Sequence, residues 1–175
     1  MRNSILVLIA LVLVACAAPP PEKADSAPSE AQKAAALRVL EDYFEAIRSD
    51  DFAAVHGFMA PSLGGITTPA TFAELHKANR ARYGRVFSRT LQGASWYPGR
   101  SREGTGLAAA VDFHGRAERA PIVCGYVSLI EIETNQFAII RDDTTFVDTA
   151  NVEGMSPAER QKLLDRPGCR RFLSQ

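Results

Sequence analysis

The three cysteines of this 175-residue sequence are the residues whose chemistry can be inferred most directly. Cys16 directly follows an apolar run, whereas Cys124 and Cys169 lie far downstream. A thiol can be modified as a nucleophile, and two thiols can form a disulfide in an oxidising compartment. The odd count is resolved when Cys16 is assigned to a processing step, because the other two cysteines then form a pair.

The N-terminal residues predict export. Arg2 supplies one positive charge, and residues 5–14 are apolar. This run is much shorter than the roughly 20 residues that a membrane-spanning helix needs. A basic start, a short apolar core and small residues after it are typical of a secretory signal peptide.

The segment Leu13-Val14-Ala15-Cys16 resembles the lipobox of bacterial lipoproteins. The resemblance implies cleavage before Cys16, acylation of its sulfur and new amino group, and stable anchoring by several acyl chains. Ala17 stands where the inner-membrane retention signal of this family has Asp, so we expect the periplasmic face of the outer membrane. The alternative is an ordinary signal peptide followed by a chance cysteine.

The chain is expected to divide into four segments. Residues 1–15 form the signal peptide, and residues 16–30 form the lipidated cysteine and a tether rich in proline. Proline and small polar residues cannot bury enough surface to fold, which is why this stretch is interpreted as a tether. Residues 31–150 form the folded domain, and residues 151–175 form a C-terminal helix and tail.

The two downstream cysteines predict a Cys124–Cys169 disulfide, since an exported chain meets an oxidising compartment. A bridge of this span would stabilise the fold by roughly 4 kcal/mol on the chain-entropy account. The alternative is a buried apolar thiol at Cys124 and a free, exposed thiol at Cys169.

Metal, cofactor and nucleic-acid chemistry is not indicated. The histidines His56, His76 and His114 match none of the spacings of a zinc site, and no phosphate-binding glycine loop or serine-nucleophile elbow occurs. We therefore expect no metal and no cofactor. The 20 basic residues balance the 20 acidic ones, which argues against a nucleic-acid partner.

Residues 76–102 are rich in basic side chains and contain no acidic one. The summed positive field of such a stretch would attract anionic lipid, lipopolysaccharide phosphate or an acidic ligand. The alternative is that these side chains pair with acidic residues of the first helix. The residues predicted to form a binding face are Arg80, Arg82, Arg85, Arg89 and Trp96.

Hydrophobic periodicity predicts helices before and after a sheet. The first helix is expected to begin at Ser29 and the second to span 52–59. The third is expected to begin at a capping box formed by Thr71 and Glu74 and to end at Gly84. A further helix is expected after the sheet, beginning at a capping box on Ser156. Strands are expected over 86–94, 107–114, 121–133, 137–140 and 144–147.

Pairing the last strands about Thr134-Asn135 puts Ile132 opposite Phe137 and Ile130 opposite Ile139. A sheet with one apolar face must be covered by helices. The expected fold is therefore α+β, with N-terminal helices packed on a curved, cone-like antiparallel sheet and a short C-terminal helix.

This order of elements resembles the cone fold of nuclear-transport-factor-2-like and ketosteroid-isomerase-like proteins. Residues 37–143 are also similar to the family called domain of unknown function 4019, whose members are small bacterial secreted or membrane-attached proteins. The residues that carry this resemblance are Arg80, Tyr83-Gly84, Ser88-Arg89, Pro98-Gly99, Val111 and Phe113. That family has no settled activity, so the resemblance implies no catalytic residues.

Two functions remain open. The favoured one is a non-enzymatic binding module for a small ligand or an envelope protein. The alternative is a ketosteroid-isomerase-like enzyme using a pocket acid such as Asp112 near Tyr43 or Tyr126. Such an enzyme needs a carboxylate within hydrogen-bond reach of a substrate carbon and an oxyanion donor opposite it. Alternation places Asp112 on the polar face of its strand, which favours the binding function.

Overall fold

The computed structural model describes residues 27–63, 67–99, 106–166 and 168–169. The predicted signal peptide, Cys16 and most of the tether therefore lie outside the described residues. The helices before the sheet are α1 (Glu30–Arg48), α2 (Phe52–Gly57), the 3-10 helix η1 (Pro61–Leu63) and α3 (Pro69–Tyr83). Those after it are α4 (Thr149–Gly154) and α5 (Pro157–Leu164).

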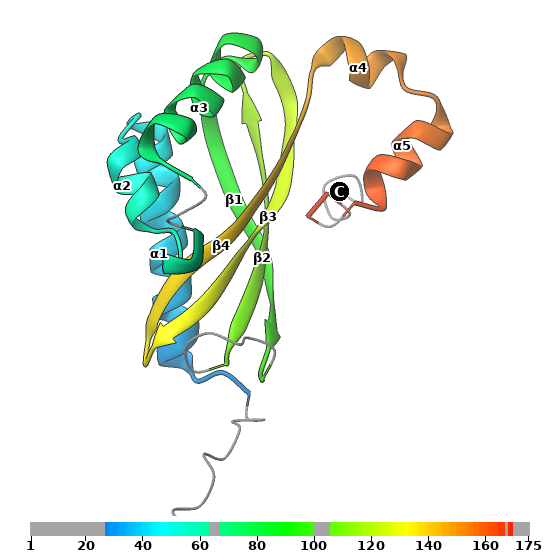
Figure 1. Cartoon of the computed structure of the whole chain (residues 1–175). Coiled ribbons are helices and arrows are strands. Elements are labelled where there is room, and N and C mark those ends of the chain that lie inside the picture. The colour runs from blue at the N-terminus through cyan, green and yellow to red at the C-terminus, as the bar shows by residue number, and fades with distance from the viewer. Residues whose placement is uncertain (1–26, 64–66, 100–105, 167, 170–175) are drawn as a thin grey trace, which may run out of the picture.

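One antiparallel sheet forms the centre of the molecule. Its strands are β1 (Val86–Tyr97), β2 (Ala108–Ala117), β3 (Ala120–Glu133) and β4 (Gln136–Val147), hydrogen-bonded in the order β1-β2-β3-β4. Figure 1 shows that the sheet is strongly curved, with α1, α2 and α3 along one side and α4 and α5 on the other. The predicted α+β fold is confirmed.

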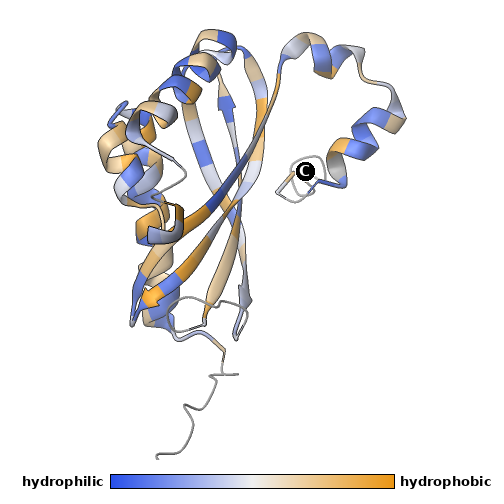
Figure 2. Ribbon diagram, viewed as in Figure 1, coloured by the Kyte–Doolittle hydropathy of each residue, from blue (hydrophilic) through white to orange (hydrophobic). Residues whose placement is uncertain are grey.

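The main core lies between α1 and the sheet face turned toward it, which we call the inner face. Leu40 and Tyr43 from α1 pack there with Val111, Phe113 and Leu129 from the strands, and all five side chains are buried. Burying each such side chain stabilises the fold by about 1.5–3 kcal/mol. In Figure 2 hydrophobic residues are concentrated in the sheet and in the helices against it, whereas α5 is mainly hydrophilic.

A second, smaller core lies on the opposite, outer face of the sheet. Helices α4 and α5 together with Cys169 form a C-terminal arm, and Leu163 of this arm packs against Ile122 and Val147. The Cα atoms of Cys124 and Cys169 are 5.1 Å apart and their sulfur atoms are bonded. The arm is thus attached covalently to β3.

The predicted register of the β3–β4 hairpin is wrong by one residue. The observed pairs are Glu131 with Phe137 and Leu129 with Ile139. A register shift between Glu131 and Glu133, beside a turn in which Asn135 has a φ of 59°, accounts for the difference. Because side chains alternate between faces, a slip of one residue exchanges the two faces. Ile130, expected in the main core, instead packs with Ala60 and Ala138 in a separate cluster.

In the observed register the side chain of Glu131 points into the interior, where it is 1% exposed. Gln32 Nε2 donates hydrogen bonds to both of its carboxylate oxygens, at 3.1 and 3.0 Å. The backbone N–H of Asn135 donates a third, at 2.7 Å. These donors make the burial of a carboxylate tolerable, and they join the first turn of α1 to the β3–β4 turn.

The helix starts are mostly as expected. The predicted N-caps Ser29 and Ser156 are confirmed, each within a capping box. The predicted start of the third helix is wrong, because Thr68 is its N-cap and accepts a hydrogen bond from the Thr71 N–H. Pro69 occupies the first helical position, where its missing N–H costs nothing. Helix α4 was not predicted.

Candidate functional site

A pocket of about 530 Å³ lies between α3 and strand β4, and we call it the α3 pocket. Its apolar wall includes Met59, Phe72, Leu75, Ile140 and Phe146. Side chains that can carry charge also line it, among them Tyr43, His76, Arg89, Arg141 and Asp142, together with neutral polar residues such as Asn79 and Thr144. The pocket therefore combines an apolar surface with polar groups from α1, α3, β1 and β4.

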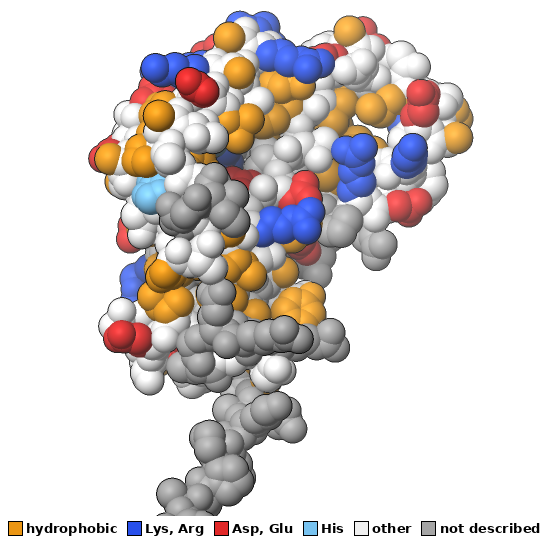
Figure 3. All heavy atoms as spheres, viewed as in Figure 1, with side chains coloured by type: hydrophobic (Ala, Val, Ile, Leu, Met, Phe, Trp, Pro, Cys, Tyr) orange, Lys and Arg blue, Asp and Glu red, His pale blue; other side chains and the backbone are white. Residues whose placement is uncertain are grey.

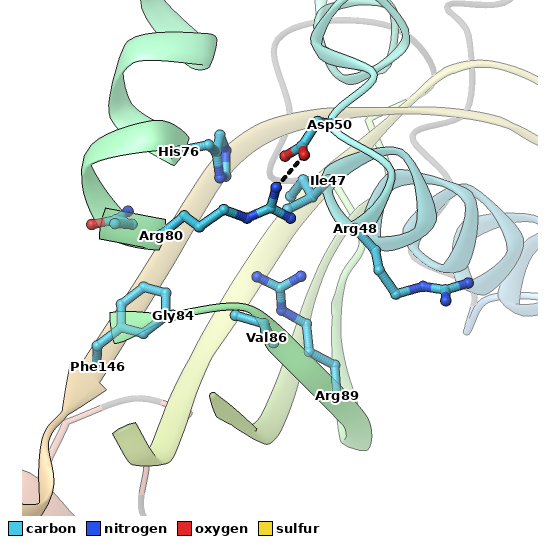
Figure 4. Close-up of a pocket in the computed structure, with 10 residues that line it drawn as sticks. Ile47, Arg48, Asp50, His76, Arg80, Gly84, Val86, Arg89 and Phe146 are labelled. Atoms are coloured by element: carbon cyan, nitrogen blue, oxygen red, sulfur yellow. Dashed lines mark hydrogen bonds and ion pairs between the residues drawn. The ribbon is translucent and has the colours of Figure 1, made fainter. Parts of the chain in front are cut away.

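A smaller cavity of about 40 Å³ adjoins the α3 pocket and shares His76, Asn79, Arg89 and Phe146 with it. Figure 4 shows this region, with Arg80 reaching from α3 to its partner Asp50. The guanidinium of Arg89 rises from β1 into the space below that pair, whereas Arg48 points away.

Arg89 is held between aromatic rings. Its guanidinium carbon lies 4.5 Å from the ring centroid of Phe44 and 5.7 Å from that of Phe113. The Nε atom is covered, and no described residue supplies it with a hydrogen-bond partner. Burial lowers the pKa of Arg89, although the negative field of Asp142 acts in the opposite direction.

Asp142 lies on the inner face of β4 and is hydrogen-bonded at both oxygens. Tyr43 Oη donates to Oδ2 at 2.7 Å, and Thr144 Oγ1 donates to Oδ1 at 2.6 Å. Burial, and then the charge of Asp142, raise the pKa of Tyr43 well above its ordinary value. Tyr43 therefore remains a protonated donor at neutral pH.

His76 forms part of the helical wall. The spacing of four residues places Phe72, His76 and Arg80 on one face of α3. The imidazole stacks on Phe52, with ring centroids 5.5 Å apart, and on Phe72 at 6.4 Å. Burial lowers the pKa of His76 below its ordinary value, which favours the neutral imidazole at pH 7.

The structure divides the predicted basic face. It brings Arg80 and Arg89 together at the small cavity that adjoins the α3 pocket, whereas Arg82 and Arg85 are exposed on the outside. Trp96 does not line the α3 pocket and packs edge-on against Phe137, with ring centroids 6.3 Å apart. Figure 3 shows basic and acidic side chains interspersed over the face in view.

The acidic partner of Arg80 is Asp50 rather than a residue of α1. Asp50 lies in the turn between α1 and α2 with a φ of 59°, a left-handed conformation that aspartate tolerates better than most residues. Within α1 itself, Glu45 is paired with Arg48.

The structure does not bring Asp112 to Tyr43. Asp112 pairs across the sheet with Tyr126, and alternation from the buried Val111 and Phe113 places both on the outer face. The carboxylate next to Tyr43 belongs to Asp142, which sequence reasoning missed. The helical spacing of Phe72 and His76 was the available sequence signal for the α3 wall, but no local signal indicated the inward position of Asp142.

Comparisons of the chain with protein-family models, curated protein sequences and solved structures found no match. The resemblances described above therefore stay predictions. Within the described ranges, no group of three or more His, Cys, Asp or Glu side chains is placed to hold a metal ion. No helix in the described part of the chain is long and apolar enough to cross a membrane.

Proposed function

We propose that the protein is a lipid-anchored periplasmic binding module whose α3 pocket takes a small, largely apolar molecule. The observation that carries this proposal is the pocket itself, at about 530 Å³. Ligand pockets are typically roughly 300–1,000 Å³ and apolar, with a few polar groups that orient the ligand. The lining by Phe72, Leu75 and Phe146 beside Arg89 and Asp142 has that character.

Two features support the cellular part of the proposal. The sequence around Cys16 resembles a lipobox, and a Cys124–Cys169 bridge is typical of proteins that enter an oxidising compartment on export. Ser29, which follows the proline-rich stretch in the sequence, is the N-cap of α1. Anchoring on the periplasmic face of the outer membrane would present the pocket to small molecules of the envelope.

The ketosteroid-isomerase-like alternative is favoured by one observation, the Tyr43–Asp142 hydrogen bond inside the pocket. A general base must reach the proton that it removes. Both oxygens of Asp142 already accept hydrogen bonds, from Tyr43 and Thr144, which leaves the binding function better supported.

Binding is tested with hexan-1-ol, a neutral probe, by saturation-transfer NMR on the full lipidated chain in nanodiscs of neutral lipid, with empty nanodiscs subtracted. Asn79 lines the pocket from α3, whereas its neighbour Ala78 is exposed on the same helix. Asn79→Trp fills the pocket and should abolish the signal, and Ala78→Trp should retain it. Equal signals from both variants would contradict a pocket-based function.

Lipidation is tested by metabolic labelling with an alkyne analogue of palmitate. Cys16→Ala should abolish the label and block maturation, because the acylated thiol is lost. The control is the double variant Cys124→Ala/Cys169→Ala, which should remain labelled. Undiminished labelling of Cys16→Ala would exclude the anchor while leaving the pocket test unaffected.

A further inference from the structure

Arg89 is a half-buried cation without a direct counter-ion. Among the described residues, none forms an ion pair with it, and its covered Nε has no hydrogen-bond partner. The rings of Phe44 and Phe113 attract the guanidinium, but they offer no acceptor oxygen. Leaving a covered N–H of a charged group without a hydrogen-bond partner is costly, so Arg89 points to a group that the fold does not itself supply.

We propose that the α3 pocket binds an amphipathic monocarboxylate whose carboxylate is held by Arg89. This inference rests on the proposed binding function and names the class of ligand. A guanidinium presents N–H groups in a planar fork that matches two carboxylate oxygens, which makes arginine the side chain best suited to this task.

The neighbouring charges favour Arg89 as the anchor. Arg141, the other guanidinium that lines the pocket, is paired with Asp143. Arg80, which lines the small adjoining cavity, is paired with Asp50. Asp142 attracts Arg89 electrostatically, but its two carboxylate oxygens already accept hydrogen bonds from Tyr43 Oη and Thr144 Oγ1. In Figure 4 the guanidinium of Arg89 is directed into the small cavity that adjoins the α3 pocket, and Arg89 lines both.

The other residues that line the α3 pocket indicate which chemical group the ligand carries in addition to its carboxylate. Met59, Phe72, Leu75 and Phe146 form an apolar wall suited to an aliphatic or aromatic tail. Asp142 lines the same pocket and would repel a second negative charge. A singly charged head with an apolar tail therefore fits better than a dianionic phosphate or a dicarboxylate.

The test compares hexanoate with hexan-1-ol, which have tails of equal length and differ in the charge of the head. Binding to the lipidated chain in neutral nanodiscs is measured for the wild type, Arg89→Met and Arg116→Met. Arg116 is exposed and lies outside the α3 pocket, so its variant controls for loss of one positive charge. Hydrogen bonds to a charged partner are stronger than neutral ones, so the wild type should bind hexanoate about tenfold more tightly than hexanol.

Arg89→Met should remove this preference and leave hexanol binding in place, whereas Arg116→Met should retain the preference. Equal binding of both probes by the wild type would overturn the role of Arg89 and leave the binding function standing. Binding of neither probe would overturn both.

A second measurement covers the case in which Arg89→Met does not fold. The Nε–H of Arg89 should give a protected NMR resonance in the wild type, because the atom is covered. Hexanoate should shift this resonance, and hexanol at equal occupancy should not. If the chemical shift of this resonance does not change at saturating hexanoate, the inference is overturned, and no variant protein is needed for this result.

Discussion

Tyr43 Oη donates a hydrogen bond to Asp142 Oδ2 across 2.7 Å, and this contact joins the middle of α1 to strand β4 inside the α3 pocket. Tyr43 is completely buried. The bond therefore fixes the distance between α1 and the sheet. It also fixes the orientation of Asp142, which among the described residues is the only carboxylate lining the α3 pocket.

Tyr43→Phe is expected to lower the free energy of unfolding by about 1–3 kcal/mol, because the ring is kept while the half-buried Asp142 loses a hydrogen-bond donor. The measurement is urea denaturation of the full chain. Tyr97→Phe is the control, since Tyr97 is 40% exposed and should change stability little. Equal effects of the two variants would show that the hydrogen bond contributes nothing.

His76 should make the fold less stable as the pH falls below about 6.5, the ordinary histidine pKa. Burial lowers the pKa of His76 in the folded protein, so the unfolded chain takes up the proton first. Stability then falls with pH from the unfolded pKa down to the folded one. Asp142 and Asp50 favour the protonated form, and Arg89 and Arg80 oppose it, but burial is the largest effect.

His76→Phe removes this titration and keeps an aromatic ring between Phe52 and Phe72. Between pH 7.5 and 5, the variant should lose less unfolding free energy than the wild type. Urea denaturation at the two pH values gives the comparison. Parallel losses in the two proteins would mean that His76 does not contribute to the pH dependence.

Local signals in the sequence were sufficient for much of the fold. Ser29 and Ser156 cap helices through hydrogen bonds within one turn, so a few neighbouring residues specify them. The hairpin register depended on a register shift beside Asn135, which exchanged the environments of Ile130 and Glu131. Nothing in the alternation of those residues distinguishes the two registers.

The candidate site was only partly accessible from sequence. Arg89 was grouped with other basic residues by charge, although it lies on the same face of β1 as Leu91, which contacts the main core. Strand alternation could have separated it from the exposed arginines. Asp142 could not be placed, because its inward position follows a register shift near Ser128 and its partner Tyr43 is remote in sequence.

The Gln32–Glu131 contact predicts a compensating exchange. Glu131→Gln should destabilise the fold by about 1–3 kcal/mol, because an amide NH₂ would then face the NH₂ of Gln32. Adding Gln32→Glu restores one acceptor and one donor, and it preserves a side-chain oxygen for the Ser29 N–H. The double variant should recover most of the unfolding free energy in urea titrations. An additive or larger loss would show that the contact is not a direct pairing.

The C-terminal arm should depend on the Cys124–Cys169 bridge more strongly than the rest of the fold. Apart from the two cysteines, Leu163 is the buried hydrophobic residue of the described arm that packs against Ile122 and Val147, and Val152 and Met155 pack there while only partly buried. A disulfide of this kind contributes about 2–5 kcal/mol, and segments with few buried contacts open locally before the whole fold does.

The double variant Cys124→Ala/Cys169→Ala is therefore expected to release α4 and α5 while the sheet remains folded. Hydrogen exchange followed by mass spectrometry should show fast exchange in α5 and continued protection across β2 and β3. The wild type, treated with a reductant, should reproduce the variant, and the untreated wild type should yield no free thiol from these two cysteines after denaturation. Protection of α5 that survives both treatments would mean that packing alone holds the arm on the sheet.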